Sequence, residues 1–297
     1  MSTLSIAANR KGIMAMCLAM ALFIANDALV KYVSASLPAA QLIFIRGLFA
    51  TIVLLTAALL MGALRPTALL QDGAWRQLTQ RPVLARASLD ALATMAYLSS
   101  LFHLPIGNAS AINMASPMFI AMYAAVVWRE RVSPARWLAI AAGFAGVLLI
   151  VQPAADAFNA WSLMCLFATL LHTARDLITR NIALTVPAIL ITLTTSTAVL
   201  LLTGPWSLLQ GWQPVNATQL GLLAGASVFL SAAHYMVIVG MRSGELSLVA
   251  PFRYTALIYA LLLGWLIWGD VPNVMAWSGI VLMVVAGLSM LRAGRTA

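Results

Sequence analysis

The sequence predicts an all-α integral membrane protein whose ten transmembrane helices form two inverted five-helix repeats. Three observations support this fold class: 63% of the residues are hydrophobic and only 8% are charged, the apolar residues fall into ten long segments, and motifs of the first half recur in the second. A composition this apolar is typical of a chain that lies in a bilayer and excludes an ordinary soluble globule.

The ten segments have about the 18 to 23 residues that a helix needs to cross a hydrocarbon core about 30 Å thick. They lie at 12–33, 38–61, 84–102, 107–128, 135–152, 158–179, 186–203, 218–240, 247–268 and 273–291. Each repeat contains five of them, so the second repeat enters the membrane from the opposite side. This inverted topology is typical of secondary transporters. The repeats are expected at residues 1–153 and 154–297.

Short polar motifs identify the repeat. Asn26-Asp27 followed by Lys31 returns 149 positions later as Arg175-Asp176 followed by Arg180. Recurrence at a fixed offset is the signature of a repeated structural unit. The first apolar segment is therefore interpreted as a structural helix of the repeat rather than as a signal peptide.

The basic residues lie on one side of the predicted membrane. The net charge of +9 could indicate a nucleic-acid partner, but thirteen of the seventeen Lys and Arg fall on one side and the opposite loops hold none. Because loops rich in Lys and Arg stay in the cytoplasm, both termini are expected there, and the chain is expected to be a multi-pass membrane protein, surrounded by lipid and without nucleic acid. The thirteen are Arg10, Lys11, Arg65, Arg76, Arg81, Arg86, Arg129, Arg131, Arg136, Arg180, Arg242, Arg292 and Arg295.

Three carboxylates lie within predicted helices, where a charge costs roughly 2.5 to 3.5 kcal/mol at the helix centre. Each has a basic residue four positions away, on the same helix face. Two interpretations stay open: local ion pairs that make insertion tolerable, or contacts that serve a substrate or a gate. The pairs are Asp27 with Lys31, Asp90 with Arg86, and Asp176 with Arg180.

Arg46, Arg175 and Arg253 also lie within predicted helices. Arg46 and Arg253 have no acidic residue within one turn of their own helix. A guanidinium at this depth needs a partner, which is a carboxylate of another helix, a set of backbone carbonyls or a carboxylate of the substrate. These arginines are therefore candidate substrate ligands, with a structural role as the alternative.

Polar stripes run along three of the predicted helices. Such stripes either form interhelical hydrogen bonds or line water, and their presence in both halves favours a central water-filled cavity. Tyr97, His172, Arg175 and His234 are the candidate ligands that they contain. The stripes are Arg86, Asp90, Thr94 and Tyr97; Thr169, His172, Arg175, Asp176 and Thr179; and Ser227, Ser231, His234 and Tyr235.

The fourth predicted helix contains Pro117. Proline has no backbone N–H, so the carbonyl of Asn113 lacks its helical donor. We therefore expect a hinge at Pro117 and a polar site at Asn113.

Motifs for catalysis and cofactor binding are missing from the sequence. It contains no G-x-x-x-x-G-K-[ST], no H-E-x-x-H and no G-x-S-x-G, so neither a nucleotide-driven pump nor a hydrolase is expected. The two cysteines, Cys17 and Cys165, provide neither a disulfide framework nor a metal motif. The protein is expected not to be an enzyme and to need no cofactor and no metal.

The end of each repeat carries the residues of a known family. Each fourth helix leads to a short acidic turn, and a glycine-rich fifth helix follows. With the run from Ala250 to Leu257, these features resemble the tandem EamA modules of the drug/metabolite transporter superfamily. Within it, the chain is similar to the bacterial YddG-type exporters of aromatic and other neutral amino acids. The two turns are Trp128-Arg129-Glu130 and Trp268-Gly269-Asp270, of which Asp270 departs from the usual Glu.

This resemblance implies a substrate cavity between the two halves, with the third, fourth, eighth and ninth helices at its wall. An amino acid fits such a site when an arginine binds its carboxylate, Asn113 accepts from its ammonium group, and Tyr97 or Tyr254 contacts its side chain. The expected function is export from the cytoplasm by alternating access, carried out by a monomer. A multidrug or other metabolite exporter of the same fold is the alternative, and a polytopic membrane enzyme is disfavoured by the missing catalytic residues.

Proton coupling is expected to be weak or absent. A cation on the same helix face keeps each intramembrane carboxylate ionised, so none of the three is suited to carry protons. The alternative carriers are His172 and His234, because an imidazole titrates near neutral pH.

A reporter fused after Ala297 tests the topology. We expect green fluorescent protein to fluoresce there and alkaline phosphatase to be inactive, because an even number of crossings and the basic loops place the C-terminus inside. Phosphatase activity at this position would contradict the ten-helix arrangement.

Overall fold

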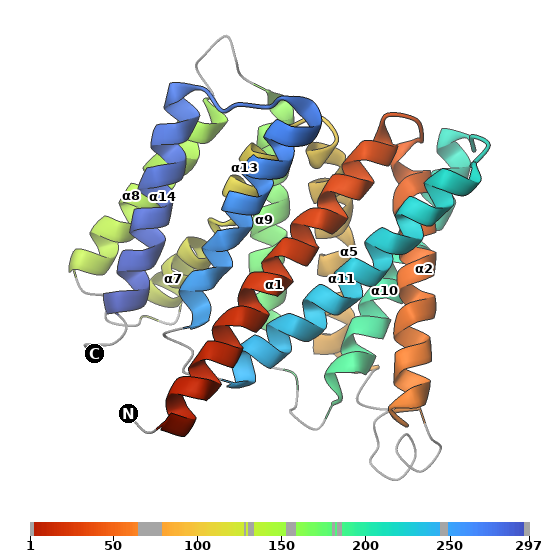
Figure 1. The fold of residues 1–297 in the computed structure, drawn as a ribbon, viewed down its shortest axis with the longest axis horizontal. Coiled ribbons are helices and arrows are strands. Elements are labelled where there is room, and N and C mark those ends of the chain that lie inside the picture. Colours follow the sequence, from red (N-terminus) through yellow and green to blue (C-terminus); the bar gives the residue numbers. More distant parts are fainter. Residues whose placement is uncertain are drawn as a thin grey trace. The chain divides into compact units, whose positions relative to one another are not determined.

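The computed structural model describes residues 3–64, 79–127, 129, 134–152, 159–179, 182, 186–243 and 249–293. Every regular element in these ranges is a helix (Figure 1), so the predicted all-α class is confirmed. The helices are α1 (Thr3–Ser34), α2 (Ala39–Leu60), α5 (Arg81–Leu101), α6 (Ile106–Asn113), α7 (Ser116–Val126), α8 (Pro134–Val151), α9 (Ala160–Thr179), α10 (Ala188–Gln210), α11 (Ala217–Ser243), η1 (Ala250–Tyr254), α13 (Thr255–Trp268) and α14 (Val274–Ala293).

Each of the ten predicted segments corresponds to one of these helices or to a consecutive pair of them. Five helical stretches of the described chain are long and apolar enough to cross a membrane, and two further apolar helices, Trp137–Val151 and Val274–Ser289, are shorter. The five are Ala7–Ser34, Ala39–Leu60, Ala188–Gln210, Ala217–Val237 and Pro251–Trp268. These lengths follow from the need to satisfy every backbone group within the segment itself when no water is present.

The fourth segment of each repeat is interrupted, although the sequence predicts a continuous helix in both places. In the first repeat α6 ends before Met114 and α7 begins at Ser116, with Pro117 in its first turn. In the second, the 3₁₀ helix η1 carries Pro251 in its first turn and gives way to α13. Pro117 explains the break between α6 and α7, because it cannot donate to the preceding turn. Pro251 begins η1 and lies before its transition to α13. The break lies beside the expected hinge at Pro117, and motion there stays a prediction.

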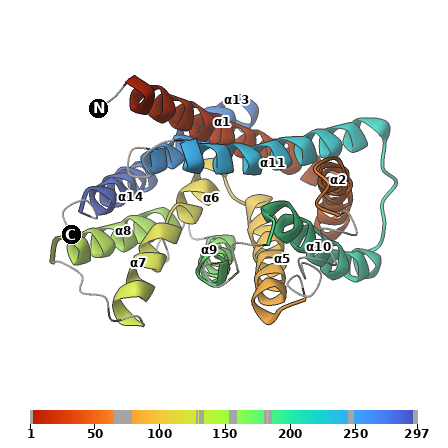
Figure 2. The same ribbon diagram turned by 90° about the horizontal axis from the view of Figure 1, so that it is seen from below.

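Two compact units make up the chain, and each takes helices from both repeats. Unit 1 comprises Met1–Ala28, His103–Leu166 and Ala232–Ala297. Within it α8 lies along α14, and α6 packs on α13 (Figure 2). The repeat boundary at residues 153 and 154 stays a prediction, and it does not coincide with the boundaries of these packing units.

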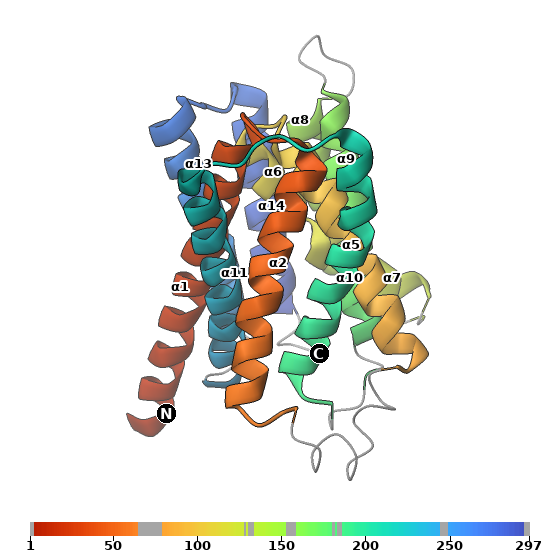
Figure 3. The same cartoon turned by 90° about the vertical axis from the view of Figure 1, so that its right-hand side faces the viewer.

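Unit 2 comprises Leu29–Phe102 and Phe167–Ser231. In this unit α10 packs against α2 and α5 (Figure 3). Gln41, which is buried on α2, bonds to the connection that follows α10, through two hydrogen bonds with the backbone of Gln213 at 2.8 and 2.9 Å. Near the middle of α2 and α10, the hydroxyls of Thr51 and Ser196 lie 2.6 Å apart.

Glycine allows the close crossing of α8 and α14. A Cβ atom built on Gly279 would lie 2.5 Å from the carbonyl oxygen of Gly146, and one built on Gly146 would lie 2.7 Å from the carbonyl of Gly279. At one end of the pair, the amides of Gln152 and Asn273 exchange two hydrogen bonds of 2.9 and 3.1 Å. Backbone approach through small residues is a common source of helix association in membranes, where the hydrophobic effect does not hold helices together.

Replacing Gly279 with Val is expected to lower the thermal stability of the purified protein in detergent. The added side chain meets the backbone of α8, and overpacking of this kind costs about 1 to 3 kcal/mol. Gly221→Ala in α11 is the matched control, because a Cβ atom there has nothing within 4 Å. Equal melting temperatures for the two variants would show that the crossing does not depend on Gly279.

Candidate functional site

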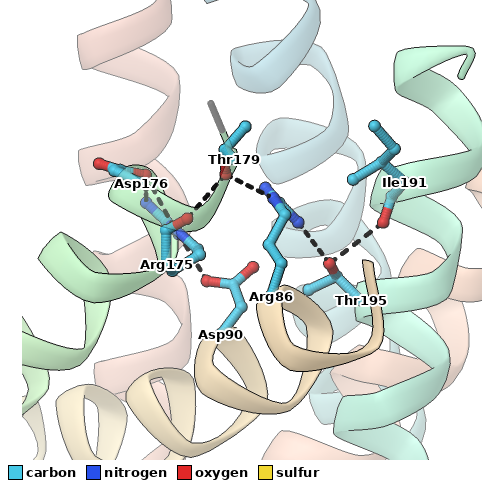
Figure 4. A network of polar contacts seen from close by, with 7 residues as sticks. All are labelled: Arg86, Asp90, Arg175, Asp176, Thr179, Ile191 and Thr195. Carbon is cyan, nitrogen blue, oxygen red and sulfur yellow. Dashed lines mark hydrogen bonds and ion pairs between the residues drawn. The ribbon is translucent and has the colours of Figure 1, made fainter. Parts of the chain in front are cut away.

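Charged and hydroxyl side chains from three helices form a connected network in unit 2 (Figure 4). Helix α5 contributes two of them one turn apart, and α9 contributes three within five residues, so each helix presents its polar groups on one face. The members are Arg86 and Asp90 on α5, Arg175, Asp176 and Thr179 on α9, and Thr195 on α10.

Arg175 joins two carboxylates. Its Nη1 lies 2.5 Å from Oδ1 of Asp90 on the neighbouring helix, and its Nη2 and Nε lie 2.8 and 2.9 Å from Oδ1 of Asp176. A guanidinium has five N–H donors in one plane, which lets it serve both acids at once. The side chains of Asp90 and Arg175 are 13% and 21% exposed and that of Asp176 is 40% exposed, so the link between helices is the more enclosed of the two.

Arg86 is held by hydroxyl groups instead of a carboxylate. Its Nε donates to Oγ1 of Thr179 at 3.0 Å, and its Nη1 donates to Oγ1 of Thr195 at 2.7 Å. Both threonine hydroxyls donate in turn to carbonyls of their own helices, those of Arg175 and Ile191. Each hydroxyl is thereby oriented with a lone pair toward the guanidinium, and α5 is tied to α9 and α10.

The structure differs from the predicted pairing of Asp90 with Arg86. A spacing of four residues puts the side chains of Arg86 and Asp90 on one face of α5. Asp90 nevertheless pairs with Arg175 of the neighbouring helix α9, because that guanidinium reaches it. Asp176 likewise takes its charge partner from Arg175, while its expected partner Arg180 lies outside the described residues.

The first-repeat counterpart of this motif has a similar local bond. Asp27 accepts a hydrogen bond of 2.9 Å from the amide of Asn26, as Asp176 accepts from Arg175. Lys31 follows one turn later on the same helix. The pairing of Asp27 with Lys31 stays a prediction.

An aromatic pair adjoins the network on the same two helices. The rings of Tyr97 on α5 and His172 on α9 have their centroids 6.1 Å apart and are tilted by 55°. Tyr97 follows Asp90 by two helical turns, and His172 precedes Arg175 by one. Three of the predicted substrate ligands, Tyr97, His172 and Arg175, are thus brought together in unit 2.

Arg46 lies in the same unit but on α2, where its side chain is buried. Its backbone carbonyl accepts a hydrogen bond of 2.9 Å from Ser227 of α11. The predicted polar stripe of α11 therefore serves, in part, to fasten that helix to α2. A contact of Arg46 with substrate stays a prediction.

The other predicted ligands belong to unit 1. Asn113 ends α6, and His234 of α11 meets the ring of Phe23 edge-on at 5.0 Å. Arg253 and Tyr254 end η1, where Arg253 is exposed and the hydroxyl of Tyr254 is buried against Gly287 of α14. The predicted site residues are therefore divided between the two units.

Thr195 is a member of the network that the sequence did not single out. A signal was present, since four of the six residues from Thr192 to Thr197 are threonines in an otherwise apolar segment. Hydroxyl side chains usually bond to the carbonyl four residues earlier in membrane helices, so this pattern alone does not identify the one that also accepts from Arg86.

These features define a helical membrane protein with a paired charge network inside its helices, which is the architecture of a membrane transporter. The chain belongs to the EamA-like transporter family, which it matches twice, over residues 10–152 and 159–292. The two matches agree with the tandem modules expected from the sequence.

Individual relatives carry different substrate names. The chain is 34% identical over 221 residues to a riboflavin transporter of Rhizobium johnstonii, covering 73% of this chain and 70% of that protein. It is 25% identical to the pseudopaline exporter CntI of Pseudomonas aeruginosa over 95% of this chain and 96% of the relative. An S-adenosylmethionine uptake transporter of Rickettsia prowazekii is 22% identical, with 90% and 87% covered.

A solved crystal structure has the same fold. It superposes on 99% of this chain and all of its own with a TM-score of 0.62, at 18% sequence identity.

Charge balance in the network is expected to control stability. Arg175→Gln leaves two carboxylates facing the single guanidinium of Arg86, and breaking an enclosed ion pair costs up to about 3 kcal/mol. The melting temperature should fall in this variant and recover in part when Asp90→Asn is added, because the second change restores neutrality. If the double variant melts lower still, by the sum of the single effects, the two side chains act independently.

Proposed function

We propose that the protein is a secondary transporter of small metabolites that carry no net charge and contain a flat ring. The observation that supports this most directly is the charge balance of the network in unit 2, which contains two guanidinium groups and two carboxylates. A site of this kind presents no net charge to its substrate, so it favours neutral or zwitterionic molecules over ions. The neighbouring rings of Tyr97 and His172 offer a surface for stacking.

Riboflavin is the first candidate substrate. It is uncharged, with a flat tricyclic ring and a hydroxylated chain, which suits aromatic side chains beside hydroxyl and charged groups. The relative with 34% identity is named a riboflavin transporter. Riboflavin therefore agrees with both the chemistry of the site and this relationship.

Aromatic and other neutral amino acids are the second candidate substrates, as expected from the sequence. They are zwitterions, so Arg175 and Asp90 offer opposite charges for their two charged groups. Arg46 and Arg253 are further candidates for the carboxylate. If amino acids are the substrates, they leave the cytoplasm down their own concentration gradient.

Transport without strong proton coupling is part of the proposal. Asp90 bonds to Arg175, and a carboxylate held by a guanidinium stays ionised through the cycle. Flux then follows the substrate gradient across the inner membrane. Proton-driven accumulation in proteoliposomes with an imposed pH gradient would overturn this part and direct attention to His172.

Counterflow into proteoliposomes of the purified protein tests the substrate. Vesicles loaded with unlabelled riboflavin should take up labelled riboflavin, and the same assay with phenylalanine tests the second candidate. Tyr97→Leu is expected to raise the KM for the ring-bearing substrate several-fold, since a stacked aromatic contact contributes about 0.5 to 1.5 kcal/mol.

The control is Gly221→Ala, which changes an exposed helix position far from the network in sequence. Exchange of phenylalanine but not riboflavin would identify the protein as an amino-acid carrier. Exchange of neither by well-folded protein, together with uptake of a charged metabolite, would contradict the proposal of a net-neutral substrate.

A further inference from the structure

We infer that Arg86, Asp90, Arg175 and Asp176 form an exchangeable latch, which holds α5 against α9 in one state of the transport cycle and re-pairs within each helix in the other. This inference rests on the proposed transport function. It assigns a conformational role to particular residues, whereas the proposed function concerns what is carried.

The present arrangement joins the helices through contacts between elements. Asp90 of α5 bonds to Arg175 of α9, and Arg86 of α5 bonds to Thr179 of α9 and Thr195 of α10. The contacts with Arg175 and Thr179 break if the end of α5 that carries Arg86 moves away from α9, and Arg86 leaves Thr195 when it turns to Asp90. A simple interhelical ion pair would then leave separated charges in the membrane, each at roughly 2.5 to 3.5 kcal/mol.

This network has a second complete set of partners. Arg86 and Asp90 are one turn apart on α5, at the spacing that lets two side chains meet on one helix. Arg175 already holds Asp176, its neighbour on α9, through two donors. Separation of the helices therefore produces two intrahelical ion pairs and no isolated charge.

The composition of the network is explained by this exchange. A static contact between α5 and α9 needs only Asp90 and Arg175. Asp176 and Arg86 add a second acid and a second base. In the present structure Arg86 donates to threonine hydroxyls, although the carboxylate of Asp90 lies one turn away on its own helix. Neutral acceptors hold the guanidinium less strongly than a carboxylate does, so Arg86 is available when Asp90 is released.

An apolar cluster closes the same end of the helices. Val83, one turn before Arg86 on α5, is 1% exposed and is buried with Ile182 and Val186 of the connection between α9 and α10, and Ile191 packs on the cluster. Movement of α5 away from α9 must open this cluster. A cysteine at position 83 is therefore a reporter of the latch.

The experiment measures the rate at which a maleimide labels Val83→Cys in purified protein, on a background in which Cys17→Ala and Cys165→Ala remove the native thiols. Arg86→Gln removes the open-state partner of Asp90, and Asp176→Asn removes the open-state partner of Arg175. Both should slow labelling, by about twofold if each intrahelical pair contributes as much as a typical ion pair on one helix.

Two matched variants should act in the opposite direction. Thr195→Val removes an acceptor that Arg86 uses only in the closed state. Arg86→Lys keeps an open-state pair with Asp90 but cannot reach both threonines with one ammonium group. Both should speed labelling, by a similar factor.

A static network predicts a different pattern. In that case every substitution loosens the packing and all four variants label faster, or none differs from the parent; either result overturns the latch. Labelling needs no substrate, so failure of the proposed function appears separately, as the absence of riboflavin and phenylalanine exchange in protein that still shows the opposed rates. Melting temperatures measured in parallel exclude variants that are unfolded.

Discussion

Charge neutralisation within the bilayer is the constraint on which the polar part of this structure depends. A guanidinium or carboxylate inside the hydrocarbon needs a partner of opposite charge or a set of hydrogen bonds, and Arg175 meets that need for Asp90 and Asp176 together. Its position on α9 decides which face of that helix meets α5. The threonine hydroxyls then extend the same contact to α10 through Arg86. Two arginines, Arg175 and Arg86, thereby link three helices of unit 2.

Backbone constraints act in parallel in unit 1. The close approach of α8 and α14 requires glycine at positions 146 and 279, and the interrupted fourth segments require proline near their breaks. Interrupted helices in corresponding positions of the two repeats are characteristic of transporters, where freed backbone groups and helix ends face the substrate pathway. Close backbone packing of α8 on α14 therefore occurs in the same unit as the interruptions between α6 and α7 and between η1 and α13.

Hydropathy predicted the position of every described helix, because a membrane-spanning segment must be long and continuous in its apolar character. The same signal could not predict the breaks after Asn113 and Tyr254, since a single proline is tolerated in many membrane helices. Helix periodicity also placed Asp90 and Arg175 on polar faces. It could not select between Arg86 and Arg175 as the partner of Asp90, because spacing along one helix says nothing about which neighbouring helix brings a better donor. The sequence also could not predict that each packing unit takes helices from both repeats, because spacing along one helix does not identify its neighbours.

A comparison of the two repeats shows how equivalent positions differ in the hydrogen-bond donors that they offer. Asn26 and Arg175 occupy equivalent positions, and each donates to the aspartate that follows it. The amide of Asn26 is neutral and has one NH₂ group, whereas the guanidinium of Arg175 carries a full charge and has donors left for Asp90 on another helix. The side chain at position 175 can therefore serve two acceptors, Asp176 of its own helix and Asp90 of α5. The repeated motif supplies the framework, and the guanidinium at this position supplies the link between α9 and α5.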